Sequence, residues 1–154
     1  MITYNRAVID EDYRCAREMF IAYSKWLNIN LEFQHFEEEL GGLRTMYAAP
    51  VGGIILVKDG EVTIGCVAIR KLNDTVGELK RMYILPAYRQ QGIGRRLLEL
   101  ALLLATECHY RVIKLDTLNY MLPAIGLYKK AGFYETPPYY HNPNATAIYL
   151  EKKL

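Results

Sequence analysis

The chain has 154 residues and a formal net charge of +2, with 19 Lys and Arg against 17 Asp and Glu. This length suits a single domain, residues 1–154, and a hydrophobic fraction of 51% excludes a disordered chain. The nearly balanced charge does not favour nucleic acid as a partner, and no apolar run reaches the roughly 18 residues that cross a membrane. The N-terminus lacks a basic patch followed by an apolar stretch, so we expect a cytoplasmic protein without a signal peptide. The three cysteines have no metal-ligand spacing, so no metal site is expected.

The first fifty residues predict one strand and two helices. Ile2 to Ile9 is the expected strand, and Asp10 is a typical N-cap for a helix over residues 11–27, in which apolar residues recur at helical spacing. Phe33 to Leu40 predicts a second, shorter helix, which Gly41 and Gly42 should end.

Three strands are predicted next. The first is Ile54 to Val57, and an Asp-Gly hairpin turn at residues 58–61 leads into the second, Val62 to Arg70. The third is Val76 to Leu85, which should stop at Pro86 because proline cannot donate to a sheet ladder.

The rest of the chain alternates helices with strands. A broad apolar stripe predicts a helix from Gly92 to about Cys108, as expected for a helix laid across a sheet. The remaining elements are a strand at Arg111 to Thr117, a helix at Pro123 to Lys130 capped by Gly132, a strand starting at Phe133, a loop at Pro137 to Pro143 and a strand at Ala145 to Glu151. This order predicts an α/β fold with a mixed sheet and one βαβ crossover through the long helix.

The loop Arg89 to Arg95 carries the strongest chemical signal. It joins a strand to the start of an apolar helix, where unpaired N–H groups and the helix dipole favour an anion. Gly92 and Gly94 lack the Cβ atoms that would keep a phosphate at a distance. The loop is neither a P-loop, which needs Gly-Lys-Ser/Thr, nor a dinucleotide fingerprint, which needs a third glycine where Leu97 stands.

Arg89-x-x-Gly92-x-Gly94, which follows Met82 to Pro86, resembles the acyl-CoA-binding motif of the GNAT superfamily of N-acetyltransferases. The segment Ala124 to Phe133 is similar to the second signature of that family, a helix ending in Tyr and then Gly-Phe. The order and separation of both signatures match over essentially the whole chain. The resemblance implies the GNAT fold, a central and mostly antiparallel sheet with helices on both faces.

The resemblance also implies that acetyl-CoA is the acetyl donor. The loop Arg89 to Arg95 would hold the CoA pyrophosphate. The strand segment Met82 to Ile84 would splay from the strand Arg111 to Thr117, so that its free edge binds the pantetheine arm. The family's Asn before the second signature is replaced by Met121, and Asn119, two residues earlier, is expected to take over its contact. The expected cofactor-binding residues are Met82, Tyr83, Ile84, Arg89, Gln90, Gln91, Gly92, Ile93, Gly94, Arg95 and Asn119.

Acetyl transfer to an amine needs a base for the ammonium and an acid for the CoA thiolate. Tyr128 occupies the position of the family's usual general acid. Glu78, four residues before Met82, is the first choice for the base because the family often has an acidic residue there. Glu32 and His141 are rivals, His141 because an imidazole has a suitable ordinary pKa.

The acceptor is expected between the N-terminal helices and the loop Pro137 to Pro143. Glu32, Tyr139, Tyr140 and His141 are the expected substrate-binding residues, since an aromatic wall with one carboxylate suits a cationic amine. The acceptor is a primary amine on a small molecule or a peptide, which no motif identifies further. The alternative function is a silent module that binds CoA or an amine without turnover. Dimers are common in the family, so a homodimer is the oligomeric state that the resemblance suggests.

Overall fold

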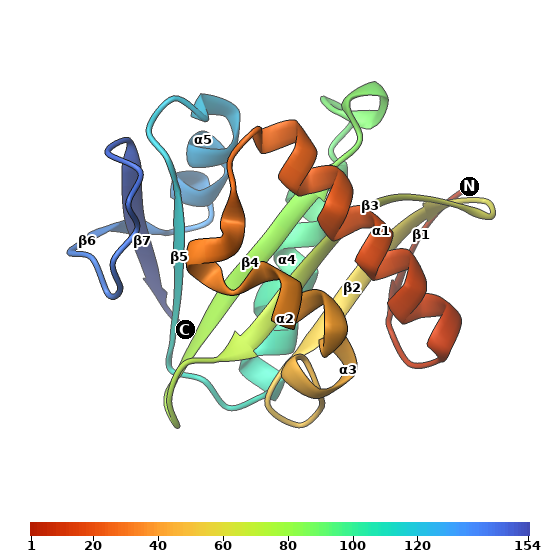
Figure 1. Ribbon diagram of the computed structural model, residues 1–154, viewed down its shortest axis with the longest axis horizontal. Helices are drawn as coiled ribbons and strands as arrows, with labels where there is room; N and C mark the ends of the chain where they lie inside the picture. The colour runs from red at the N-terminus through yellow and green to blue at the C-terminus, as the bar shows by residue number, and fades with distance from the viewer.

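The computed structural model describes residues 1–154, which form a seven-stranded sheet in the order β1-β2-β3-β4-β5-β7-β6 (Figure 1). All neighbouring strands are antiparallel except β4 and β5, which are parallel. The strands are β1 (Ile2–Arg6), β2 (Gly53–Asp59), β3 (Val62–Lys71), β4 (Val76–Ile84), β5 (Val112–Leu118), β6 (Tyr134–Thr136) and β7 (Ala147–Lys153).

Helices cover both faces of the sheet (Figure 1). Two apolar clusters fill the two sides, one beneath α4 and the other beneath α1, α2 and α3. No helix has both the length and the apolar character needed to span a membrane. The α-helices are α1 (Asp10–Leu27), α2 (Phe36–Gly41), α3 (Leu43–Met46), α4 (Ile93–Glu107) and α5 (Leu122–Lys130), and the short 3-10 helices are η1 (Leu31–Gln34) and η2 (Pro86–Tyr88).

The predicted mixed sheet with one crossover is confirmed. The parallel pair β4 and β5 is joined by α4, which packs against β2, β3 and β4. Parallel strands need such a crossover because a short turn cannot return the chain to the same end of the sheet. The helix predicted from Gly92 begins one residue later, and Gly92 is its N-cap with φ of 80°.

The N-terminal helices differ from the prediction: the short helix α3 was not expected, and the two predicted helices differ in the following ways. The N-cap of α1 is Ile9 rather than Asp10, and the Asp12 carboxylate accepts the backbone N–H groups of Val8 and Ile9. The helix predicted over residues 33–40 is broken at His35, whose φ of 56° ends η1 before α2 begins. A left-handed residue cannot continue a helix, and the periodicity of apolar residues does not reveal it.

Candidate active site

The parallel ladder between β4 and β5 is short. It pairs Val76, Gly77 and Glu78 with Val112, Ile113 and Lys114, although both strands continue for several residues. Figure 1 shows the two strands diverging toward the end of the sheet at which α5 lies. A cavity of about 570 Å³ opens at this divergence and is bounded by both strands, α5 and the region from α1 to η1. The splay that the family resemblance implies is therefore present.

A β-bulge lies in β4 at Arg81, where φ is 58° and the register with β3 shifts between Cys66 and Ala68. The extra residue changes which side chains face α1. Lys80 pairs with Ala68 and Tyr83 with Cys66, so both lie on the α1 face although they are three residues apart. Bulges re-aim side chains in this way, and here the bulge directs Met82 to the opposite face.

A buried ion pair holds the bulge. Arg81 donates two hydrogen bonds to Glu39 of α2, at 3.0 Å from Nε and 2.6 Å from the terminal nitrogen, and the two side chains are 4% and 1% exposed. Tyr47 donates a third hydrogen bond of 2.8 Å to the same carboxylate. Burial raises the pKa of Glu39, but the hydrogen bonds and charge of Arg81 outweigh burial, and the pKa lies below its ordinary value. A bidentate pair of this kind fixes the position of Arg81.

The start of α4 is open. No side chain caps the helix, and Gln90 and Gly92 both have positive φ, at 63° and 80°. Left-handed residues alternating with right-handed ones turn successive N–H groups toward a common point, which makes an anion-binding concavity. A Cβ on Gly92 would meet no atom within 4 Å and would extend into the space in front of the helix.

The Arg89 side chain contacts both α1 and the end of β4. Its guanidinium lies 4.5 Å from the centre of the Trp26 ring, and its Nε donates a 2.9 Å hydrogen bond to the Ile84 carbonyl oxygen. Arg89 therefore connects the end of β4 to α1 and contributes positive charge to the cavity wall.

Tyr128 of α5 lines the cavity and is only 6% exposed. Its ring packs edge-on against Phe133 with ring centres 5.7 Å apart. Burial raises the pKa of Tyr128, so the phenol stays protonated and is available as a donor.

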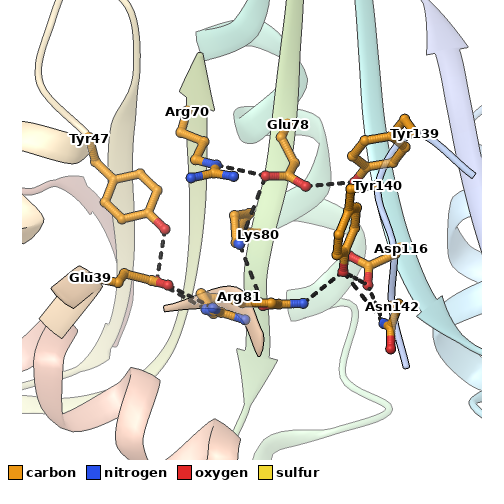
Figure 2. Close-up of polar contacts among 11 residues, drawn as sticks. Glu39, Tyr47, Arg70, Glu78, Lys80, Arg81, Asp116, Tyr139, Tyr140 and Asn142 are labelled. Carbon is orange, nitrogen blue, oxygen red and sulfur yellow. Dashed lines mark hydrogen bonds and ion pairs between the residues drawn. The ribbon is translucent and has the colours of Figure 1, made fainter. Parts of the chain in front are cut away.

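Glu78 lies behind the cavity wall and does not line it. Its side chain is 3% exposed, accepts hydrogen bonds of 2.7 Å from Arg70 Nε and 2.6 Å from the Tyr139 hydroxyl, and lies 3.8 Å from Lys80 Nζ. Figure 2 shows its carboxylate between Arg70 on one side and Tyr139 on the other. The role of Glu78 as the base stays a prediction, since Lys80 lies between it and the cavity.

Lys80 and Asp116 are two polar residues on the α1 side of the cavity that the sequence did not predict. Burial, followed by the charge of Arg81, lowers the pKa of Lys80 to about 8. Asp116 accepts hydrogen bonds from the Tyr140 hydroxyl and, at 3.0 Å, from the Asn142 side chain. A signal for Lys80 exists in the sequence, because Glu78 and Lys80 are charged residues two apart in a strand flanked by apolar ones.

Only some of the predicted site residues line the cavity. Met82, Tyr83, Ile84, Arg89, Gln90, Gly94 and Tyr128 line it, and so do the unpredicted Trp26, Gln34, Asn142 and Asn144. Gln91, Gly92, Ile93, Arg95, Asn119, Glu32, Tyr139, Tyr140 and His141 do not line it. Tyr139, Tyr140 and His141 instead border a shallower depression on the C-terminal loop (residues 137–146).

The splayed parallel pair, the open helix start beside the cavity and the buried tyrosine are the features that the resemblance implies for an acyl-CoA-dependent transferase. Residues 9–133 match the family model described as Acetyltransferase (GNAT) family. An uncharacterized N-acetyltransferase of Schizosaccharomyces pombe is 33% identical over 134 residues, which cover 86% of this chain and 82% of that protein. The chain belongs to the acetyltransferase (GNAT) family and is an N-acetyltransferase with acetyl-CoA as its donor.

Solved structures agree on the fold. An acetyltransferase from Streptococcus agalactiae superimposes with a TM-score of 0.81 at 21% identity and covers 99% of this chain and 98% of its own. The PaiA N-acetyltransferase from Thermoplasma acidophilum, solved in complex with coenzyme A, has a TM-score of 0.76 at 20% identity and covers 100% and 99%.

Proposed function

We propose that the chain acetylates a primary amine of a small molecule or peptide by direct attack of the amine on acetyl-CoA bound along β4. The observation that carries the proposal is the divergence of β4 and β5 beyond Glu78 and Lys114, at the wall of the cavity. Beyond this point the edge of β4 has no partner in β5, and a pantetheine arm would add to it as an extra strand does. A backbone N–H of this segment would polarise the thioester carbonyl.

The CoA pyrophosphate would lie at the start of α4. The uncapped N–H groups that follow Gly92 support this assignment, together with the positive potential of the helix dipole. Arg95 and Arg96 add positive charge there, although both also contact Glu99 at 3.3 and 3.4 Å.

In the reaction, the amine nitrogen attacks the thioester carbon and the carbonyl electrons move to oxygen. Collapse of this tetrahedral intermediate expels the CoA thiolate, which takes a proton from the Tyr128 hydroxyl. The position of Tyr128 at the cavity and its raised pKa support this role, because the phenol is protonated until the thiolate develops.

The proton of the attacking amine needs a carboxylate, and Asp116 is better placed than Glu78. Both hydrogen bonds to Asp116 end on Oδ2, which leaves Oδ1 free of hydrogen bonds within the chain, and Asp116 lines the cavity. After attack the nitrogen carries a positive charge and is far more acidic than the free ammonium, so a carboxylate can accept its proton. Glu78 stays the rival base, acting from behind Lys80.

The test is CoA-thiol release from acetyl-CoA with a panel of primary amines, together with calorimetry of CoA binding. We expect amine-dependent release by the wild type, and a pH–rate profile displaced to higher pH for Asp116→Asn but not for Glu78→Gln. Binding of CoA without release for any amine would support the silent module instead. A displaced profile for Glu78→Gln alone would return the base to Glu78.

A further inference from the structure

The wall of the cavity on the α1 side carries a buried cation without a full counter-charge. Lys80 Nζ has Glu78 at 3.8 Å, but that carboxylate already accepts a hydrogen bond of 2.7 Å from Arg70. Its other contact is a long one, 3.5 Å to Gln34 Oε1. The side chain is 7% exposed and borders the cavity. An ammonium group has three N–H donors, so Lys80 keeps donors and charge for a ligand.

Neighbouring charges do not neutralise Lys80. Arg81 is matched by Glu39, and Arg70 shares the one carboxylate of Glu78 with Lys80. These five side chains thus carry three positive and two negative charges. Arg70 is partly exposed to solvent, so the positive charge that stays buried without a full partner is that of Lys80, where the cavity begins. A buried charge without a full partner is costly, and an anion entering the cavity would offset that cost.

Asp116 supplies the opposite charge on the same wall of the cavity without pairing with Lys80. The Gln34 side chain separates the two, since its Oε1 faces Lys80 and its Nε2 donates a 2.8 Å hydrogen bond to the Tyr140 hydroxyl. Tyr140 in turn donates to Asp116 (Figure 2). Gln34 therefore keeps the Lys80 ammonium and the Asp116 carboxylate at separate points of one wall, and each can still form hydrogen bonds with a ligand.

The rest of the cavity lining is mainly apolar. Seventeen of the 28 residues that line the cavity are hydrophobic, and α1 and η1 contribute Tyr23, Leu31 and Phe33. A ligand that fits this wall therefore carries two opposite charges and an apolar body.

From these contacts we propose that the acceptor is an amino acid with an apolar side chain, whose carboxylate binds Lys80 and whose amine lies at Asp116 Oδ1. The inference rests on the proposed acetylation and names its substrate class. In the reaction the amine nitrogen gains the acetyl group, and the carboxylate remains unchanged. A hydrogen bond between two charged groups in a buried site changes affinity by roughly tenfold or more.

The experiment compares leucine and phenylalanine with leucinamide and phenylalaninamide, which have the same shape and amine but no carboxylate. We expect the wild type to show kcat/KM at least tenfold higher for each amino acid than for its amide. Lys80→Met should lower kcat/KM for the amino acids at least tenfold more than for the amides. Lys80→Arg, which keeps the charge, should retain most of the preference.

The outcomes separate this inference from the proposed function. Amides acetylated as well as amino acids by the wild type overturn the substrate class and leave the proposed function standing. An equal loss for both under Lys80→Met, in a variant that still binds CoA, assigns Lys80 to the structure and also overturns it. No thiol release with any amine overturns both proposals.

Discussion

The Tyr139 hydroxyl donates a 2.6 Å hydrogen bond to Glu78, 61 residues earlier in the chain, and thereby attaches the C-terminal loop to the central strand. Burial and the adjacent carboxylate raise the pKa of Tyr139, so the phenol remains a donor across the ordinary pH range. The neighbouring Tyr140 has a different partner, Asp116 at the cavity wall. Two adjacent tyrosines of one loop therefore hold two different strands.

This difference predicts different effects for two matched variants. Tyr139→Phe should destabilise the fold by about 1–3 kcal/mol, because Glu78 loses a buried donor, while the KM of the amine stays unchanged. Tyr140→Phe should raise the KM of the amine several-fold, because Asp116 loses the group that orients it, and leave the KM of acetyl-CoA unchanged. Urea unfolding and steady-state kinetics check both. A raised amine KM for Tyr139→Phe alone would place the acceptor near Tyr139 instead.

Gly92→Val should weaken CoA binding at least tenfold. The substitution places a branched side chain in the space before the helix, where two or more charge-assisted hydrogen bonds of roughly 1.5–3 kcal/mol each would form. Valine is also strained at a φ of 80°, so backbone strain must be separated from lost binding.

Gly60→Val is the matched control for Gly92→Val. Gly60 lies in the hairpin between β2 and β3, has a φ of 60° and likewise has no atom within 4 Å of an added Cβ. Both variants should lose stability, but calorimetry should find unchanged CoA affinity for Gly60→Val. Equal CoA affinity for the wild type and Gly92→Val would remove the pyrophosphate from this loop.

Tyr128→Phe should keep the fold and CoA binding and lower turnover by about 10²-fold, the usual contribution of general acid catalysis. Tyr134→Phe, on β6 and outside the cavity lining, is the control and should turn over normally. Single-turnover measurements are the appropriate readout, and full activity of Tyr128→Phe under them would end the acid assignment.

The parts of this site that the sequence predicts are those encoded by local pattern. The glycine loop, the crossover helix and the strand that precedes them follow from residue types at fixed spacing in one segment. The bulge at Arg81 cannot be predicted in this way, because one extra residue in a strand leaves no periodic signal. Its position also depends on the ion pair with Glu39, which is 42 residues away in the chain. The contact between Gln34 and Tyr140 spans 106 residues and depends on how η1 packs on the C-terminal loop. The expected acceptor wall stays a prediction for this reason: Tyr140 does not line the main cavity, and its hydroxyl donates to Asp116, which does.

The buried pair of Glu39 and Arg81 predicts acid sensitivity. The folded-state pKa of Glu39 is below its ordinary value of 4.5, so the stabilisation is fully present above that pH and is lost as the pH falls through the lower folded-state pKa. Glu39→Gln should lower the free energy of unfolding at pH 7 by about 3–5 kcal/mol, because the charge of Arg81 stays buried without its partner. Glu37→Gln, on the exposed side of α2, should change it little. Urea unfolding between pH 3 and pH 7 checks both. If the free energy of unfolding falls equally with falling pH in Glu39→Gln and the wild type, the assignment is contradicted.

Lys80 should reduce stability, and the sign of its pH dependence follows from its pKa. Burial and Arg81 lower that pKa from the ordinary 10.5 to about 8, so between these values the unfolded chain binds more protons than the folded one. The free energy of unfolding should therefore rise with pH in that window, by at most about 1.4 kcal/mol per pH unit. Lys80→Met fills a similar volume without a charge and leaves Glu78 with Arg70, so it should be more stable than the wild type at pH 7 and lack this rise. Urea unfolding of both proteins at pH 7, 8, 9 and 10 measures the difference, and parallel pH curves would show that Lys80 is not desolvated in the folded state. A residue that lowers stability and yet borders the cavity is explained by a ligand that supplies its counter-charge, which is the role that the amino-acid carboxylate has in the proposed complex.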